Sequence, residues 1–163
     1  MTRRGLVNRL VVGLLMAAIA LLTAFTAPAT AAVSDSVRAL PELTVYRSPT
    51  CRCCGHWTDH MKAAGFPVQD IVTEDMAAIK ARYGVPEALA SCHTALVDGY
   101  VIEGHVPATD VQRLLSEHPS VLGIAAPGMP MGSPGMEMGN RVDPYTVVSF
   151  TQTGETATFA EHP

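Results

Sequence analysis

Three cysteines stand within four residues in the stretch SPTCRCCGHW, which covers residues 48–57. Cys51 and Cys54 have the spacing of a redox pair, in which one thiolate attacks a disulfide and the other resolves the mixed disulfide. Cys53 lies between them, and a third thiol in such a turn is a liability because it permits scrambled disulfides. A soft metal ion, by contrast, gains a ligand from each additional thiolate. The spacing therefore favours metal binding, and thiol–disulfide chemistry stays open as the alternative.

The adjacent pair Cys53 and Cys54 favours more than one ion. Neighbouring residues on a helix point about 100° apart, so these two thiols cannot easily hold one ion from a single direction. Each can hold a different ion, with sulfur atoms bridging between the ions. At the start of a helix, unpaired backbone N–H groups and the helix dipole also favour thiolates. We therefore expect a cysteine-bridged, multinuclear site at the beginning of a helix.

A thiol and an imidazole recur farther along the chain, at Cys92 and His93 in the stretch ASCHTALV. Both are candidate ligands of the same centre. Consecutive side chains of an extended strand face opposite ways, so both reach one centre only if the backbone bends there. The alternative for His93 is a supporting histidine that orients a ligand or caps the strand.

Other nitrogen and sulfur donors are spread along the chain. His56 and His60 lie on the same helical face as Cys53, and His60 is a candidate ligand; the alternative is an exposed pair. His105, in GHVP, is a candidate ligand that follows a predicted hairpin. The segment 125–140, AAPGMPMGSPGMEMGN, holds four methionines. Its thioethers either fold over a soft ion or belong to an oxidisable linker.

The softness of these donors indicates the metal. Thiolate, imidazole and thioether together fit Cu(I). Zinc also binds Cys and His, but a closed zinc site takes four donors in a tetrahedron and has no use for methionine. We therefore expect copper, as more than one Cu(I) ion, with zinc as the less favoured alternative.

Hydrophobic periodicity places these residues on strands and helices. The buried stripe of the first helix comprises Cys54, Trp57, Met61 and Ala64. The sequence predicts strands over 43–48 and 67–73, helices over 53–64, 74–84 and 109–118, and a hairpin over 93–105 that turns at Asp98-Gly99.

This order, β-α-β-α-β-β-α, predicts an α/β fold of the thioredoxin-like sandwich type. In such a fold the loop before residue 93 faces the cysteine turn. The Met/Gly/Pro-rich segment 125–140 cannot form a regular element and is expected to be a loop. Residues 145–150 and 155–160 are expected to form a C-terminal β-hairpin.

The first 31 residues have the layout of an export signal. Three arginines in the first nine residues form a positive head, an apolar run over 10–25 follows, and small residues precede the expected cleavage near Ala31/Ala32. The run is shorter than the ~20 residues that a membrane-spanning helix needs, which leaves a membrane anchor as the weaker alternative. The signal is either of the general secretion type or, by a loose match, of the twin-arginine type. We expect cleavage of 1–31, a flexible lead-in over 32–42 and a single metal-binding domain over 43–160.

Removal of this signal takes three of the 11 basic residues and none of the 15 acidic ones, which leaves a net charge of about −7. Such a charge argues against nucleic acid or anionic lipid as a partner. Four cysteines in an exported chain normally suggest two structural disulfides. Three thiols within one turn cannot cross-link distant segments of the chain, however. We therefore expect a periplasmic protein without membrane association after cleavage, whose cysteines are clustered for chemistry.

Three stretches, TCRCCGHW, SCHTALVDGYVIEGHVP and APGMPMGSPGME, together resemble the CopG-type periplasmic copper-resistance proteins over roughly residues 43–160. The resemblance implies a thioredoxin-like fold and a cysteine-bridged multinuclear copper cluster. Arg52 departs from the expected glycine, and its charge either offsets the clustered thiolates or points into solvent. The ligands that the resemblance implies are Cys51, Cys53, Cys54, Cys92, His93, His105, Met129 and Met136.

The combined expectation is an exported protein that sequesters Cu(I) and contributes to copper tolerance. Its expected partners are copper ions and other copper-handling proteins of the cell envelope. A thiol–disulfide oxidoreductase, or a thiol-dependent reductase of thioredoxin-like fold, is the rival from another class. A chaperone that hands copper to a partner is the second rival.

Overall fold

The computed structural model describes residues 39–163. The predicted export signal over 1–31 and the predicted lead-in up to residue 38 lie outside the described residues. Within the rest of the lead-in, Leu40 packs against the hydrophobic core. Across residues 39–163, no helix has the length and apolarity needed to cross a lipid bilayer.

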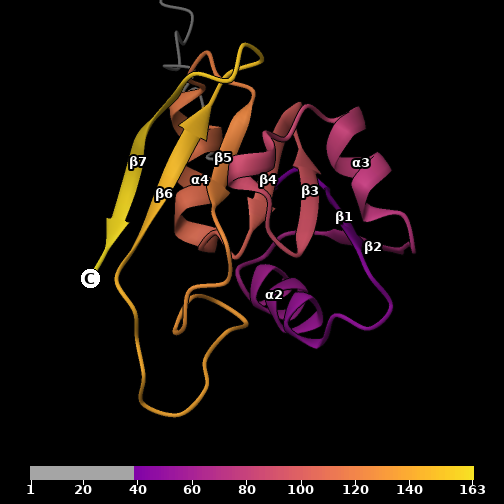
Figure 1. The fold of residues 1–163 in the computed structure, drawn as a ribbon, viewed down its shortest axis with the longest axis vertical. Helices are drawn as coiled ribbons and strands as arrows, with labels where there is room; N and C mark the ends of the chain where they lie inside the picture. Colours follow the sequence, from indigo (N-terminus) through magenta and orange to yellow (C-terminus); the bar gives the residue numbers. More distant parts are fainter. Residues whose placement is uncertain (1–38) are drawn as a thin grey trace, which may run out of the picture. The chain divides into compact units, whose positions relative to one another are not determined.

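One seven-stranded sheet organises the described part of the chain (Figure 1). Its spatial order is β2-β1-β3-β4-β5-β6-β7. The pairs β1–β2 and β4–β5 are parallel because a helix crosses between their strands, and the other neighbours are antiparallel. The strands are β1 (Leu43–Arg47), β2 (Val68–Val72), β3 (His93–Val97), β4 (Tyr100–Gly104), β5 (Gly123–Ala126), β6 (Tyr145–Phe150) and β7 (Thr156–His162).

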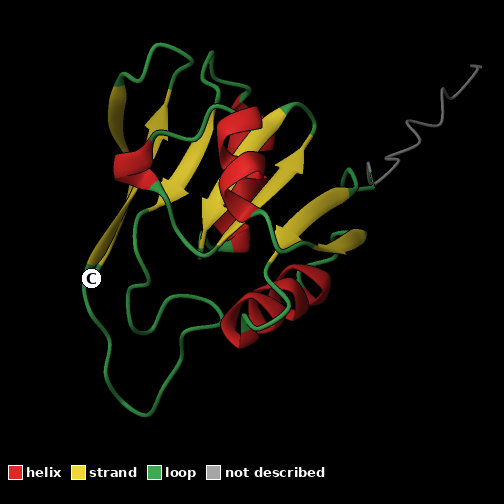
Figure 2. Cartoon of the chain, turned by 45° about the vertical axis from the view of Figure 1, so that its right-hand side comes forward, coloured by secondary structure: helices red, strands yellow, loops and turns green. Residues whose placement is uncertain are grey.

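The helices lie outside the sheet, as layers against the strands (Figure 2). Asp75 is the N-cap of the helix over Met76–Arg82: its carboxylate accepts the backbone N–H of Ala78 at 2.9 Å. Between β3 and β4, Asp98 and Gly99 both have positive φ, 47° and 84°, which is the tight hairpin turn that the sequence predicts. The helical segments are α2 (Arg52–Ala63), α3 (Met76–Arg82), the 3₁₀ segment η1 (Glu87–Leu89) and α4 (Ala108–Glu117).

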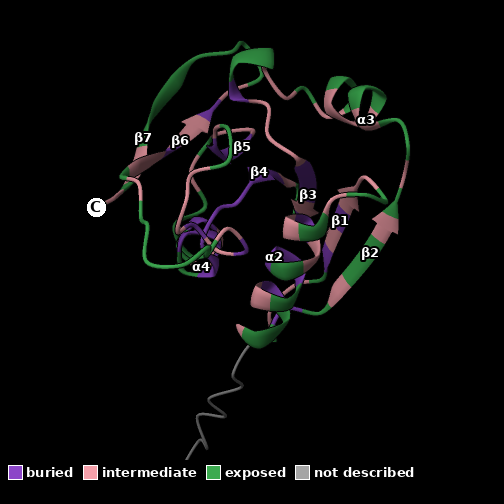
Figure 3. Cartoon of the chain, turned by 60° about the horizontal axis from the view of Figure 1, so that its bottom comes forward, coloured by how far each residue is buried: buried purple, intermediate pink, exposed green. Residues whose placement is uncertain are grey.

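Two hydrophobic clusters cover the two faces of the sheet. The larger cluster packs Trp57 of α2 and Leu114 of α4 against strands β1, β3 and β4. The smaller one packs Leu89 of η1 against Val101 of β4 and Phe150 of β6 on the other face. In Figure 3 the strand β4 is largely buried, whereas α3 shows only exposed and half-buried residues. Helix α2 therefore lies on the face that carries the larger cluster.

The predicted helices and strands are present, with ends shifted by a few residues, and the mixed α/β class is confirmed. The buried stripe of the first helix is also confirmed, since Cys54, Trp57 and Met61 are fully buried and Ala64 packs against the core. One expectation is wrong: segment 125–140 does not lack regular structure from its first residue, because Gly123–Ala126 forms β5 beside β4. This four-residue run is buried on both faces and has no alternation for a periodicity argument to detect.

Candidate metal centre

Helix α2 brings three thiols to its first turn. Cys51 is the N-cap residue, and Cys53 and Cys54 follow it inside the helix. The thiol of Cys51 makes no capping hydrogen bond, so it is not used to begin the helix. The buried indole of Trp57 fixes the helix to the domain, because its Nε1 donates to the carbonyl oxygen of Val106 at 2.8 Å. Packing one turn farther on thus holds the thiols in place.

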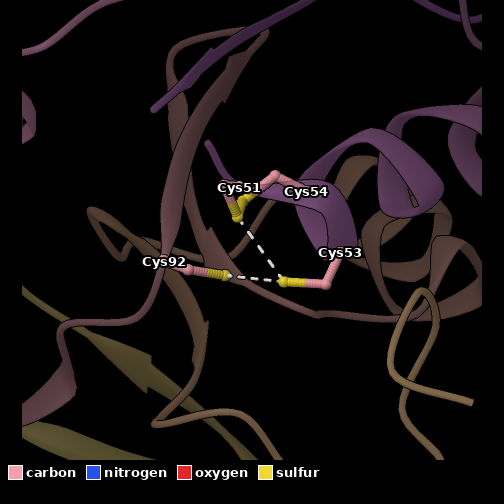
Figure 4. Close-up of side chains that lie close together, drawn as sticks. All are labelled: Cys51, Cys53, Cys54 and Cys92. Carbon is pink, nitrogen blue, oxygen red and sulfur yellow. Dashed lines mark hydrogen bonds between the residues drawn. A yellow bond between two sulfur atoms is a disulfide. The ribbon is translucent and has the colours of Figure 1, made fainter. Parts of the chain in front are cut away.

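The four cysteine sulfur atoms all lie within 4.8 Å of one another (Figure 4). Cys51 and Cys54 form a disulfide, and Cys53 and Cys92 are free. Cys53 Sγ lies 3.5 Å from Cys51 Sγ and 3.9 Å from Cys92 Sγ. Cys92 comes from the loop before β3, so the prediction that this loop faces the cysteine turn is confirmed. Cys53 is the thiol that connects the two segments.

A second group of donors shares Cys92 with the first. It comprises Cys92, His93 and His105, whose donor atoms also lie within 4.8 Å of one another. Cys92 Sγ is 3.0 Å from His105 Nε2 and 3.5 Å from His93 Nδ1. The backbone therefore bends at Cys92 in the way that a common centre requires. His93 and His105 meet edge to face, with ring centroids 5.0 Å apart.

The tautomer of His105 follows from its second nitrogen. Nδ1 lies 2.7 Å from the carbonyl oxygen of Pro134, and because a carbonyl only accepts, Nδ1 carries the proton and donates. Nε2 is then the unprotonated nitrogen, and it points at the Cys92 thiol. Burial lowers the pKa of His105, which keeps the ring neutral. A neutral imidazole oriented by a carbonyl is the usual form of a metal-ligating histidine.

His93 is completely buried and incompletely satisfied. Its ring packs against the indole of Trp57 with centroids 4.3 Å apart. Within residues 39–163, its Nε2 has no hydrogen-bond partner. Burial holds the pKa of His93 well below its usual value, and His105 and Lys80 lower it further. Its other nitrogen, Nδ1, lies 3.5 Å from the free thiol of Cys92, so this neutral imidazole and the thiol form a donor pair that fits a soft metal ion.

The Cys92 thiol is uncharged in the absence of a cation. Burial, together with the neighbouring Cys53, raises the pKa of Cys92 to about 12. A metal ion that binds here must displace the thiol proton, so binding releases protons to solvent.

A long loop over 127–144 runs from β5 past the start of α2 to β6 (Figure 1). Two hydrogen bonds tie this loop to the centre. Ser91 Oγ, next to Cys92, donates to the carbonyl oxygen of Gly128, and His105 donates to that of Pro134. The loop is therefore part of the wall of the site.

Direct packing on α2 gives the loop a third attachment. Gly135 has φ of +84°, and a Cβ there would lie 2.7 Å from both the carbonyl oxygen of Cys53 and the backbone nitrogen of Trp57. Of the two predicted methionine ligands, Met136 follows directly and is half-buried, whereas the side chain of Met129 is 56% exposed. The structure thus brings the segment around Met136 to the cysteine turn and leaves Met129 open to solvent.

His60 belongs to neither group of donors. Its Nε2 accepts the backbone N–H of Ala108 at 3.1 Å, which satisfies a free donor at the start of α4. Burial lowers the pKa of His60, in keeping with a nitrogen that accepts. His56, on the same helix, is exposed.

Sequence reasoning missed the residues that support this centre. Glu103 and Lys80 form a buried ion pair next to the Cys92 loop, and Pro134 and Gly135 hold the long loop against it. For Glu103 a signal exists, since it is the only charged residue in the apolar stretch YVIEGHV. No local pattern marks the backbone contacts of Pro134 and Gly135.

Comparison with known proteins finds one matching family and two similar solved structures. The family described as protein of unknown function DUF411 matches residues 89–136. No protein with a curated description matches. Two solved structures, described as forms 1 and 2 of the copper resistance protein copG, are each 48% identical over 76% of this chain. They are covered over 98% and 99% of their own length, with TM-scores of 0.72 and 0.73. The chain therefore belongs to the CopG family of copper resistance proteins.

Proposed function

We propose that this protein binds copper as Cu(I) in a multinuclear site bridged by cysteine sulfur. One observation carries the proposal: four cysteine sulfur atoms lie within 4.8 Å of one another. Nitrogen atoms of His93 and His105 lie within the same distance of one of these sulfur atoms, that of Cys92. Such a set is larger than one tetrahedral ion requires, and its softness favours Cu(I) over zinc. The copper-resistance title of the similar solved structures supports the same metal.

In this proposal the four cysteines are the bridging ligands. His93 and His105 complete the coordination on the side of Cys92, where their nitrogens already lie. Met136 and Met129 supply thioethers from the long loop over 127–144. His60 is assigned to the start of α4 instead, because its Nε2 already accepts a backbone N–H.

Full loading requires reduction of the Cys51–Cys54 disulfide. The disulfide takes up two electrons and two protons from a thiol reductant, which is itself oxidised to a disulfide, and gives two thiols. Each thiol then loses its proton when it binds Cu(I). The reduced protein should therefore bind more Cu(I) than the oxidised protein, in which Cys53 and Cys92 are the free thiols.

We place this activity in the periplasm, after cleavage near Ala31, where it would contribute to copper tolerance. Other envelope proteins that handle copper are the proposed partners. A thioredoxin-like arrangement is part of the same proposal. It is supported by the strand order β2-β1-β3-β4 and by cysteines at the start of the helix that follows β1.

Anaerobic titration of the reduced protein with Cu(I), in competition with a chelator, tests the proposal. Saturation at several ions per chain is expected, with zinc unable to displace them. Saturation at one ion or none would overturn the multinuclear site. Parallel titration of the oxidised protein checks the requirement for reduction.

Thiol–disulfide exchange is the second candidate function, and the Cys51–Cys54 disulfide at the start of α2 favours it. An oxidoreductase needs those two thiols alone. Its turnover should survive Cys53→Ser and deletion of residues 128–138, whereas both changes should weaken copper retention. The same two variants therefore distinguish copper binding from thiol–disulfide exchange.

A further inference from the structure

A fully buried carboxylate lies beside the candidate metal centre without belonging to its donors. Glu103 of β4 has no exposed side-chain surface. Lys80 Nζ of α3 donates to its Oε1 at 2.5 Å, and Thr94 Oγ1 donates to its Oε2 at 2.7 Å. A buried ion pair of this kind contributes little net stability compared with apolar residues of the same volume. The pair is therefore weak evidence for a role in stability, and its other contacts become informative.

One hydrogen bond of this carboxylate reaches the loop that carries Cys92. The backbone N–H of Ser91 donates to Glu103 Oε1 at 2.6 Å. Ser91 directly precedes Cys92 and lies between η1 and β3, outside the sheet. A backbone donor in such a position needs a partner from elsewhere in the fold, and Glu103 supplies it.

Ser91 packs closely against the backbone of Gly104, where there is no room for a side chain. Gly104 has φ of +73°, and a Cβ there would lie 2.5 Å from the Cβ of Ser91 and 2.8 Å from the carbonyl oxygen of Ala126. In a regular strand Glu103 and His105 would face the same side. The positive φ of Gly104 breaks this alternation, so that Glu103 contacts Lys80 of α3 while His105 contacts the cysteine site.

We infer that Glu103 is a positioning residue, which holds Ser91 and through it fixes the Cys92 thiol against His93 and His105. The inference rests on the proposed metal-binding function, because the geometry that Glu103 maintains is that of the proposed ligands. Lys80 balances the charge of the carboxylate. Partners that orient metal ligands in this way typically change metal affinity by ~10–100-fold.

Two double variants separate this hydrogen bond from the ion pair. Lys80→Met with Glu103→Gln removes both charges and keeps a side-chain oxygen that can accept the Ser91 N–H. Lys80→Met with Glu103→Leu removes both charges and the acceptor, at similar volume. A third variant, Ser91→Pro, removes the N–H and keeps the Lys80–Glu103 pair, so it also serves if the leucine variant does not fold. It also removes the hydrogen bond from Ser91 Oγ to Gly128, and Ser91→Ala, which removes that bond alone, is its control.

Two measurements on the full chain are needed for each variant that unfolds cooperatively. The first is Cu(I) affinity of the reduced protein, by anaerobic chelator competition. The second requires no metal: it is the rate at which iodoacetamide alkylates Cys92 relative to Cys53, while the Cys51–Cys54 disulfide is intact. Cys53 lies on another element of the same molecule and serves as the internal standard. Because its sulfur is 3.9 Å from that of Cys92, its own alkylation rate in each variant is first compared with the wild type.

The glutamine double variant should keep the wild-type affinity and alkylation ratio. The leucine double variant and Ser91→Pro should lose about 10–100-fold in Cu(I) affinity, and their Cys92 should react faster relative to Cys53. Equal values in the glutamine and leucine variants would overturn the inference. Failure of the wild-type protein to retain Cu(I) would overturn the proposed function alone, and the alkylation ratio would then decide the role of Glu103 by itself.

Discussion

On one side of the candidate centre, the three thiols of Cys51, Cys53 and Cys54 come from four consecutive residues at the start of α2. On the other side, Cys92 and His105 are 13 residues apart and meet only because β3 and β4 pair as a hairpin. The helix side contains a disulfide, and its free thiol is partly exposed. The strand side buries both imidazoles completely.

The difference suggests a division of tasks between the two sides. The helix side holds sulfur that can change its oxidation state. The strand side holds donors whose positions are set by hydrogen bonds and packing. Cys53 Sγ lies within 4 Å of Cys51 Sγ on the helix side and of Cys92 Sγ on the strand side, so a substitution of Cys53 removes a contact between the two sides.

The largest effect is expected for Cys53→Ser, because it removes the sulfur atom that connects the two sides. The affinity for Cu(I) should fall by more than the ~10–100-fold typical of losing a ligand's supporting partner. Anaerobic chelator competition on the reduced protein measures this affinity. His56→Gln, an exposed change on the same helix, is the control and should bind like the wild type. Undiminished binding by the serine variant would contradict a shared centre.

A smaller loss is expected for His105→Gln, which affects the strand side alone. The change removes the imidazole nitrogen beside Cys92 and the Nδ1–H that donates to Pro134. The affinity for Cu(I) should fall, but by less than in Cys53→Ser because the four sulfur donors remain, and X-ray absorption should detect fewer nitrogen neighbours of copper. His118→Asn is a matched control, since His118 is exposed and asparagine tolerates its positive φ. An unchanged absorption spectrum would remove His105 from the centre.

The long loop over 127–144 touches both sides, and Gly135→Ala tests that contact. The new Cβ must lie 2.7 Å from backbone atoms of α2, so the loop has to move away. Gly139→Ala is the matched control, because Gly139 also has a positive φ, 66°, but no atom near its Cβ position.

Compared with this control, Gly135→Ala should lower the free energy of unfolding by a further ~1–3 kcal/mol, the usual cost of overpacking. Urea unfolding followed by far-UV circular dichroism measures the difference. Cu(I) affinity should fall for Gly135→Ala only. Equal unfolding free energies of the two variants would mean that the loop does not rest on α2.

The smallest effect concerns His60, which lies on α2 but contacts α4. Its pKa is lowered in the folded protein, chiefly by burial, so below about pH 6.5 the unfolded chain binds a proton that the folded protein excludes. The free energy of unfolding of the metal-free protein should therefore fall as the pH drops through that window, and recover above it. The binding of one whole proton would change the free energy of unfolding by ~1.4 kcal/mol per pH unit. His60 is only partly buried, so solvent screening should keep the measured change well below that value.

His60→Gln keeps an acceptor for the Ala108 N–H and removes the titration. The variant should show a shallower pH dependence than the wild type in urea unfolding between the lowered pKa and pH 6.5. Identical slopes for His60→Gln and the wild type would contradict the buried, accepting role of His60, and a loss of Cu(I) affinity in His60→Gln would return it to the candidate ligands.

Much of the fold was readable in the sequence because its elements are strongly periodic. The apolar spacing of Cys54, Trp57 and Met61 predicts both the helix and its buried face, and Asp98-Gly99 predicts the hairpin. The sequence did not predict β5, because its four residues are all small or apolar and show no alternation. The same limit applies to His60. The sequence predicts which face of the helix it occupies, but not its hydrogen-bond partner, a backbone N–H of α4.

By itself, the sequence determined that three thiols gather at the start of a helix, because residues so close along the chain share one turn in any packing of that helix. Only the tertiary structure decided that Cys53 faces Cys92, that His105 presents its unprotonated nitrogen to the same thiol, and that a buried carboxylate holds the Cys92 loop. These contacts depend on sheet register and on the positive φ of Gly104. Distant segments meet through such features, and local periodicity carries no information about them.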